Sequence, residues 1–277
     1  MPIIHAIVLG LVQGLSEFLP ISSSGHLLLV PWFFGWNDFA DESTQKSFDV
    51  ALHIGTIIAA VAYFRHDLTR YIGAGLGSLR PAGRPMSTDA RVAWLLLAST
   101  VPAALIGAAF EEWIDEQLGT PLIIAISLIV FGLLLAVADR ATGTRPIEGY
   151  RVRDAVTIGA AQALALNPGT SRSGITITAS RFQGFSRDAA ARISFLMMLP
   201  VTTGAVIVKV GGMLGDGVPS DLVAPMIVGI ITSAISGWIA VWGTLRLVRT
   251  KSFTPFVVYR VALGIVVLVV LAAGWRS

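Results

Sequence analysis

Apolar residues fill most of this chain in long runs, and polar residues interrupt two of those runs near the middle. Six uninterrupted runs approach the ~20 residues that a helix needs to cross a bilayer, and they cover residues 48–64, 92–110, 120–138, 190–210, 222–247 and 256–274. Proline, glycine and hydroxyl residues divide the other two runs into arms at 3–19 and 24–34, and at 154–166 and 173–182. An arm this short favours a helix that turns back inside the bilayer. The pattern predicts an all-α, polytopic membrane protein with six transmembrane helices and two re-entrant helical hairpins, in the order hairpin, three spans, hairpin, three spans.

The two interrupted runs carry the same residues at the same spacing. A shift of 149 positions superposes six pairs, namely Gly10/Gly159, Gln13/Gln162, Leu15/Leu164, Ser22/Ser171, Ser24/Ser173 and Gly25/Gly174. We expect one integral membrane domain over residues 1–277, made of half-repeats at about 1–140 and 150–277.

Composition supports the membrane assignment and charge gives an orientation. Hydrophobic residues make up 54% of the 277 residues and charged residues only 13%, whereas a soluble domain carries about 25% charged residues. Fifteen of the 20 basic residues fall in four segments, at 65–91, 139–153, 181–192 and 246–251. Lys46 and Lys209 are the only basic residues in the alternate loops 37–47, 111–119 and 209–221. Topology therefore explains the net charge of +3 better than nucleic-acid binding does.

Placing the four basic segments in the cytoplasm opens the first hairpin to the outside and the second to the cytoplasm. Two halves with opposite insertion form an inverted-topology repeat, whose interrupted segments meet near the bilayer midplane. The arm 3–19 would just reach across the bilayer if the N-terminus were cytoplasmic. Cysteine is absent, which excludes disulfides and cysteine-ligated metal sites.

The first break carries a candidate catalytic set. Gln13 and Glu17 are four residues apart and share a helix face, and a carboxylate inside a membrane usually faces a cavity or a partner. Ser22, Ser23 and Ser24 can bind an anion with the free amides of the following helix, and one hydroxyl could act as a nucleophile. His26 could be the base, the nucleophile itself or the acid for a leaving group. The structural alternative is a serine-rich helix cap followed by a first-turn histidine.

The second break is built to hold phosphate. Arg172 is its only basic residue, and a buried guanidinium favours a bidentate anionic partner. Candidate donors and close-approach positions around it are Ser171, Ser173, Gly174 and Thr176. The structural alternative is a static ion pair between Arg172 and Glu17.

Three other positions stand out. Asp49 and His53 are four residues apart in the first span and could ligate a divalent cation or position water, and Mg²⁺ or Ca²⁺ would take oxygen ligands from Glu17, Asp49 and substrate phosphates. Arg260 lies about one turn inside the last span and is expected to snorkel inward. The Arg-edged segment 65–80 predicts a surface helix.

These motifs resemble those of a known family. The run Gln13-Gly14-Leu15-Ser16-Glu17 fits the (E/Q)xxxE motif of the bacterial undecaprenyl-diphosphate phosphatases, also called bacitracin resistance proteins. The run Pro168-Gly169-Thr170-Ser171-Arg172-Ser173-Gly174-Ile175-Thr176 fits the PGxSRSxxT motif of that family at every fixed position. The serine-rich run from Ser22 to His26 also resembles its counterpart there.

The resemblance implies hydrolysis of undecaprenyl diphosphate to undecaprenyl phosphate, which recycles the carrier lipid for cell-wall synthesis and confers bacitracin resistance. It implies a site open to the outer face of the bacterial inner membrane, a divalent cation (Mg²⁺ or Ca²⁺) and often a homodimer. By motif position, Glu17 assists catalysis or binds metal, Ser23 and His26 are the nucleophile candidates, and Arg172 grips the diphosphate. Many members have Glu where this chain has Gln13, which makes Gln13 a doubtful metal ligand.

The sequence also bears on two other functions. Inverted repeats with broken helices are also a transporter architecture, so a polyprenyl-phosphate flippase is the alternative to the phosphatase. A pure carrier, however, does not need Glu17, Ser23 and His26 beside an arginine. The acid-phosphatase-like lipid phosphatases require a histidine six residues after the arginine of their Ser-Arg motif, and here that position is Thr178.

Overall fold

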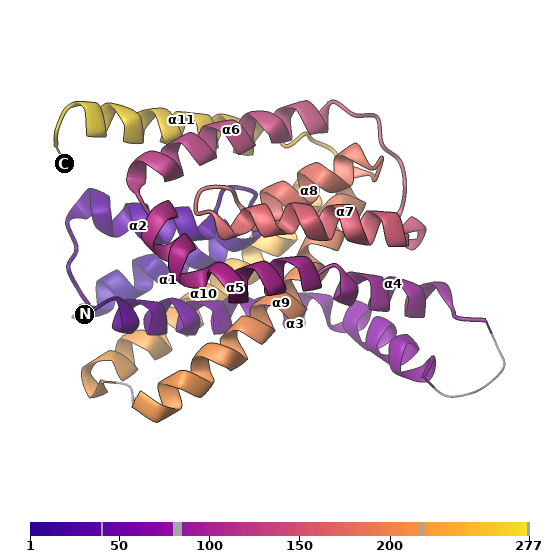
Figure 1. The fold of residues 1–277 in the computed structure, drawn as a ribbon, viewed down its shortest axis with the longest axis horizontal. Coiled ribbons are helices and arrows are strands. Elements are labelled where there is room, and N and C mark those ends of the chain that lie inside the picture. The colour runs from indigo at the N-terminus through magenta and orange to yellow at the C-terminus, as the bar shows by residue number, and fades with distance from the viewer. Residues whose placement is uncertain (40, 80–84, 217–218, 276–277) are drawn as a thin grey trace.

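The computed structural model describes residues 1–39, 41–79, 85–216 and 219–275 and is shown in Figure 1. Within these residues the regular structure is helical, apart from one isolated bridge between Arg145 and Phe185. The first half contains α1 (Ile3–Phe18), α2 (Ser23–Phe34), α3 (Glu42–Gly77), α4 (Thr88–Ala98), α5 (Val101–Leu118) and α6 (Pro121–Asp139). The second half contains η1 (Ile147–Gly149), α7 (Val152–Ala163), η2 (Leu164–Leu166), α8 (Arg172–Phe182), α9 (Arg187–Asp216), α10 (Ser220–Val248) and α11 (Thr254–Ala272).

Six helical stretches of the described chain are long and apolar enough to cross a membrane. They are Ser43–Gly77, Thr88–Phe110, Pro121–Asp139, Arg187–Gly211, Ser220–Val248 and Thr254–Ala272. Each overlaps one of the six predicted spans, so the all-α fold with six spans is confirmed. The shorter apolar helix Ile3–Phe18 falls outside this group. The re-entrant insertion of the two broken pairs and the half-repeat boundaries stay predictions.

Local sequence explains where the helices begin and end. Thr120 accepts a hydrogen bond from the amide of Ile123 at the start of α6, and Pro121 occupies the first helical position, where its missing N–H costs nothing. Between α4 and α5 the chain breaks at Ser99 and Thr100, two residues before Pro102, whose ring cannot continue a helical hydrogen-bond ladder.

The helix α3 is longer than expected. Its 36 residues make it about 54 Å long at 1.5 Å per residue, whereas the hydrocarbon core is about 30 Å thick. Residues 65–77 are helical and mostly exposed, as expected for the surface helix at 65–80, but they continue α3 without a break; residue 80 lies outside the described residues. In Figure 1 the end of α3 and the start of α4 project together from the rest of the molecule.

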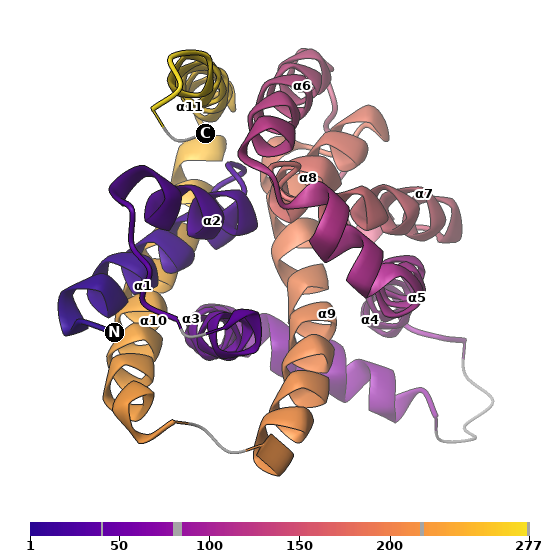
Figure 2. The ribbon, with the colours of Figure 1, turned by 60° about the vertical axis from the view of Figure 1, so that its left-hand side comes forward.

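Small residues bring the first broken pair close to α10. The helix α10 packs against both α1 and α3, and Figure 2 shows it running beside them. A Cβ atom at Gly14 would lie 2.0 Å from Ser236 Oγ and 2.4 Å from the carbonyl oxygen of Ser233. The glycine therefore permits a close helix approach that places the end of α1 deep in the bundle.

Both broken pairs fold back on themselves and meet at their breaks. The helices α1 and α2 contact each other, as do α7 and α8. The amide of Gly169 donates to Ser22 Oγ at 3.0 Å, and Ser173 Oγ donates to the carbonyl oxygen of Leu19 at 3.1 Å. The two breaks are thus hydrogen-bonded to each other, although they are well over a hundred residues apart in sequence.

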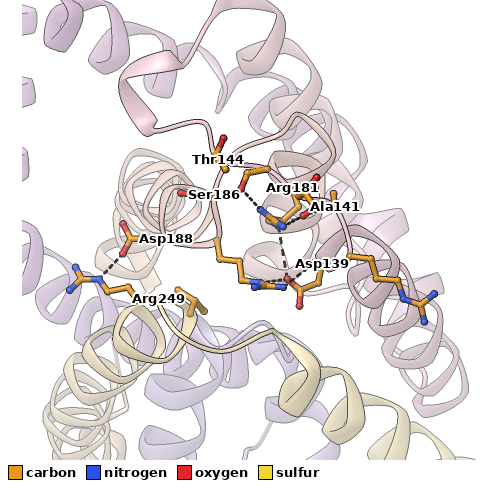
Figure 3. A pocket seen from close by; sticks show the side chains of 12 residues that line it. Asp139, Ala141, Thr144, Arg181, Ser186, Asp188 and Arg249 are labelled. Atoms are coloured by element: carbon orange, nitrogen blue, oxygen red, sulfur yellow. Dashed lines mark hydrogen bonds and ion pairs between the residues drawn. The ribbon is translucent and has the colours of Figure 1, made fainter.

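An ion-pair network ties together the loops at the end of the molecule that carries most of the basic residues (Figure 3). Asp139 accepts a hydrogen bond from Arg187 Nε at 2.5 Å and one from the amide of Phe253 at 2.9 Å. Arg181 donates to the carbonyl oxygens of Ala141, Gly143 and Phe185. Arg249 donates to Asp188 at 3.0 Å, and this hydrogen bond raises the pKa of the guanidinium. These contacts fix the end of α6, the turn between α8 and α9 and the end of α10 relative to one another.

Candidate active site

A polar cavity of about 360 Å³ opens where the two breaks meet α3 and α9. It is lined from the breaks by Glu17, Ser22, Ser23, Ser24, Ala165, Ser171 and Arg172, from α3 by Lys46, Asp49, Val50 and His53, and from α9 by Val201, Thr202, Ala205, Val206 and Lys209. A larger cavity of about 500 Å³ lies at the ion-pair network. None of the predicted site residues lines that cavity, so the chemistry belongs to the smaller one.

The carboxylate of Glu17 is the centre of the site. It lies in the last turn of α1 and is only 6% exposed, so it needs partners to remain charged. Arg172 Nη2 donates to Glu17 Oε1 at 2.9 Å, and Ser23 Oγ donates to Glu17 Oε2 at 2.5 Å. Gln13 Nε2 also donates to Oε2, at 3.2 Å, so the carboxylate accepts three hydrogen bonds in all. The predicted meeting of Glu17 with Arg172 is therefore present, and Ser23 joins it.

This arrangement can activate a hydroxyl beside a cation. A serine hydroxyl is a weak nucleophile until a base accepts its proton, and Glu17 Oε2 is placed to do so. The guanidinium of Arg172 is also fixed by the carbonyl oxygen of Ser194, 3.1 Å from Nη1. Thr176 does not line the cavity, but its hydroxyl donates to Ser194 Oγ at 2.8 Å and supports the same turn of α9.

The two breaks have the same unusual backbone. Ser22 and Ser171 have positive φ angles of 79° and 73°, and among the described residues they are the only non-glycine positions with φ above zero. Each caps the helix that follows, because Ser22 Oγ accepts from the amide of Gly25 at 3.3 Å and Ser171 Oγ accepts from that of Gly174 at 3.0 Å. A strained backbone of this kind costs about 1–3 kcal/mol and is often found at functional sites.

Two helix N-termini therefore face one cavity. The first amides of a helix have no intrahelical acceptor and bind anions well. Ser23 begins α2 and Arg172 begins α8, and both side chains line the cavity. Ser24 hydrogen-bonds Ser22 at 3.5 Å, and Ser173 hydrogen-bonds Ser171 at 3.2 Å, so the hydroxyls of each break form a short chain.

His26 is not brought to the cavity with Ser23. Its Nδ1 lies 2.6 Å from the carbonyl oxygen of Ser22, and its Nε2 lies 2.7 Å from the hydroxyl of Tyr259. A carbonyl oxygen only accepts, so Nδ1 carries the proton and Nε2 of the neutral ring accepts from Tyr259. Both ring nitrogens are thus engaged in holding the Ser22 turn against α11.

The wall formed by α3 adds charged groups to the site. Asp49 and His53 both line the cavity, as the i, i+4 spacing suggested, and His53 Nε2 lies 3.9 Å from Glu17 Oε2. Sequence reasoning gave Lys46 and Lys209 no role in the site, yet both line the same cavity. The available signal was that these two are the only basic residues in the loops predicted to lie outside.

The donor set suits a substrate-bridged cation better than a protein cage. In the described part of the chain no group of three or more His, Cys, Asp or Glu side chains is arranged to hold a metal ion. Glu17 and Asp49 nevertheless line the same cavity. Magnesium is commonly bound by one or two carboxylates together with substrate phosphates, and these residues fit that mode.

One residue near the site was misjudged from sequence. Arg260 was expected to snorkel inward along the last span, but it is fully buried. Its guanidinium donates to backbone carbonyl oxygens of both breaks. The signal in the sequence was an arginine inside an apolar run, and it did not reveal which carbonyls the side chain would meet.

Comparison with known proteins gives a consistent result. The family model described as bacitracin resistance protein BacA matches residues 6–266. A protein named undecaprenyl-diphosphatase from Geobacter sulfurreducens is 49% identical over 276 residues, which cover 99% of this chain and 100% of the relative. Proteins of the same name from Elusimicrobium minutum and Moorella thermoacetica are 42% and 41% identical, and the matches cover 96% and 98% of this chain and 97% and 98% of those relatives.

Proposed function

The chain belongs to the bacitracin resistance protein BacA family, and from this premise we propose that it hydrolyses undecaprenyl diphosphate to undecaprenyl phosphate and inorganic phosphate. The product is the carrier lipid in the form that cell-wall synthesis can use again, so the activity also confers bacitracin resistance. The observation that carries the proposal is the joint hydrogen bonding of Ser23 and Arg172 to Glu17 in a cavity of the membrane domain. The names of the relatives supply the substrate.

The diphosphate binds where the two helix N-termini converge. Arg172 and the first amides of α2 and α8 supply positive charge and donors, and the hydroxyls of Ser171 and Ser24, which line the cavity, supply further hydrogen bonds. Phosphoryl transfer depends mostly on positioning and on neutralising the equatorial oxygens. Apolar α9 residues, including Val201, Ala205 and Val206, form the wall along which the prenyl chain leaves toward the lipid.

Ser23 is the nucleophile in this proposal. Its Oγ attacks the terminal phosphorus while its proton passes to Glu17 Oε2, 2.5 Å away. The bond from phosphorus to the bridging oxygen breaks, and undecaprenyl phosphate leaves with the proton that Glu17 returns. Water then attacks the phosphoserine with Glu17 as base, phosphate departs, and the proton on Glu17 restores the Ser23 hydroxyl. His26 fixes the turn at Ser22 through its hydrogen bond to the Ser22 carbonyl oxygen and does not attack the phosphorus.

A divalent cation, Mg²⁺ or Ca²⁺, completes the proposed site. Asp49 and Glu17 would hold it together with substrate phosphate oxygens, and when bound it neutralises charge on the diphosphate. The side chains that orient the substrate are already fixed by the protein, since Arg172 is bonded to Glu17 and Ser194 and Ser23 is bonded to Glu17.

The chain is a multi-pass membrane protein, and we place it in the bacterial inner membrane with the cavity open to the outer side. Lys46 and Lys209, which come from the segments poor in basic residues, line this cavity, whereas arginines of the basic segments line the separate cavity at the ion-pair network. A homodimer remains part of the proposal through the family resemblance alone. The proposed reaction is the same whichever side the cavity opens to and whether the protein is a monomer or a dimer.

The test is phosphate release by the purified protein. Native protein is expected to release inorganic phosphate from undecaprenyl or farnesyl diphosphate, and added chelator is expected to reduce the rate. Absence of turnover, together with rapid transbilayer movement of the lipid in vesicles, would favour the flippase alternative. A flippase needs the anion grip of Arg172 but has no use for a serine bonded to a carboxylate.

A further inference from the structure

Arg260 of α11 is buried among backbone carbonyls instead of carboxylates. Its side chain is 0% exposed. All its hydrogen bonds in the described part of the chain go to main-chain oxygens, from Nε to Leu128 at 3.2 Å and from Nη2 to Ser127 at 3.4 Å, both in α6. A buried cation of this kind is costly, so its position calls for a reason.

The remaining hydrogen bonds of Arg260 reach both breaks at once. Nη1 donates to the carbonyl oxygen of Pro20 at 3.2 Å in the first break. Nη2 donates to the carbonyl oxygens of Gly169 and Thr170, each at 2.9 Å, in the second break. Backbone carbonyls freed inside a membrane need donors from the protein itself, and one guanidinium serves the two breaks together.

Two glycines leave room for this side chain. A Cβ atom at Gly174 would lie 2.7 Å from Arg260 Nη1, and a Cβ atom at Gly132 would lie 3.3 Å from Arg260 Cβ. Gly174 of the PGxSRSxxT run is therefore set directly against Arg260. Glycines of α6 and α8 thus leave the space that the Arg260 side chain of α11 occupies.

We infer that Arg260 is a positioning residue, which holds the two breaks at the separation at which Ser23 and Arg172 can act on one phosphoryl group. The inference rests on the proposed function. Pro20 lies three residues before Ser23, and Thr170 lies two residues before Arg172, so the same guanidinium fixes the chain just ahead of both groups. The planar fork of arginine matters here, because a lysine ammonium cannot span carbonyls in several directions.

The experiment compares the native protein with Arg260→Lys and Arg260→Gln in two measurements. In the phosphate-release assay kcat is expected to fall about 100-fold, the cost of a misplacement of about 1 Å, while KM changes little. The chain has no cysteine, so spin labels can be attached at Leu15→Cys and Leu164→Cys. These positions are exposed and equivalent in the two broken pairs, and the distance distribution between the labels is expected to broaden in both variants.

Arg181→Lys is the matched control, because Arg181 is also buried and also donates to carbonyl oxygens, but at the ion-pair network. It should lower thermal stability and leave the label distances unchanged. Native kcat in folded Arg260→Lys, or a fall in kcat with unchanged distances, overturns the inference. If neither Arg260 variant folds, Gly174→Ala displaces the guanidinium instead, because its Cβ would lie 2.7 Å from Arg260 Nη1, and unchanged kcat and distances there overturn the inference too.

The label distances are measured without substrate and therefore separate the two ideas. A native protein that releases no phosphate refutes the proposed function. A distance distribution that broadens only in the Arg260 variants would still show that Arg260 braces the breaks.

Discussion

Replacing Arg172 by alanine removes from the cavity the guanidinium that is bonded to Glu17 and leaves the rest of the site in place. The substitution deletes the hydrogen bond to Glu17 Oε1 at 2.9 Å and the one to the carbonyl oxygen of Ser194 at 3.1 Å. Ser23 and Gln13 still donate to Glu17 Oε2. The variant therefore tests what the guanidinium contributes to phosphoryl transfer.

Two magnitudes follow from this geometry. An arginine that neutralises charge in a phosphoryl-transfer transition state contributes about 10³–10⁵ in rate, so kcat should fall by that factor. Breaking a buried ion pair costs about 3–5 kcal/mol. The cost here should lie at about 3 kcal/mol, near the low end of that range, because two donors to Glu17 remain.

The assay is inorganic phosphate released from farnesyl or undecaprenyl diphosphate, with thermal unfolding of the same sample in detergent. Arg172→Lys keeps the charge without the bidentate fork and should recover part of the rate. Combining Arg172→Ala with Glu17→Gln removes the unpaired charge, so it should recover stability and no activity. A single Arg172→Ala variant that keeps its rate within about tenfold of native would refute the argument, since less than about 1.4 kcal/mol would then depend on the guanidinium.

Three other outcomes are expected. Acid-quenched protein given substrate labelled in its terminal phosphate should carry an acid-stable label that Ser23→Ala abolishes, whereas an acid-labile label would transfer the nucleophile role to His26. Gly174→Ala should lower both kcat and thermal stability, because its methyl group would lie 2.7 Å from Arg260 Nη1, and native values for both would contradict that contact. Asp139→Asn should cost about 3 kcal/mol of stability in thermal unfolding while KM stays native, and an unchanged melting temperature would show that the ion-pair network does not stabilise the fold.

The spans and the breaks were accessible from sequence because each follows from a local rule. Apolar length determines a span, and the Pro20 and Pro168 breaks with their flanking serines mark where a helix must stop. The meeting of Glu17 and Arg172 was also predictable, because Glu17 is the only carboxylate in residues 10–26 and Arg172 is the only arginine or lysine in the matching residues 159–175.

Other features depend on packing that no local pattern encodes. From its spacing, His26 could face either the cavity or a neighbouring helix. In the structure it faces α11, where it hydrogen-bonds the hydroxyl of Tyr259, which is far away in sequence. The direction of Arg260 depends on where α11 lies against α6. A surface helix was expected at residues 65–80. Because no proline or cap separates residues 65–77 from the span before them, these residues continue α3.

The equivalence of the two breaks explains why Ser23 and Arg172 lie in one cavity. A shift of 149 positions places Arg172 on Ser23, so each is the first residue of a helix that follows a serine with positive φ. The same backbone thus brings both side chains to one cavity. The halves differ at the carboxylate, because Leu166 occupies the position equivalent to Glu17. Only the first break therefore places a carboxylate within hydrogen-bond distance of its own serine hydroxyl.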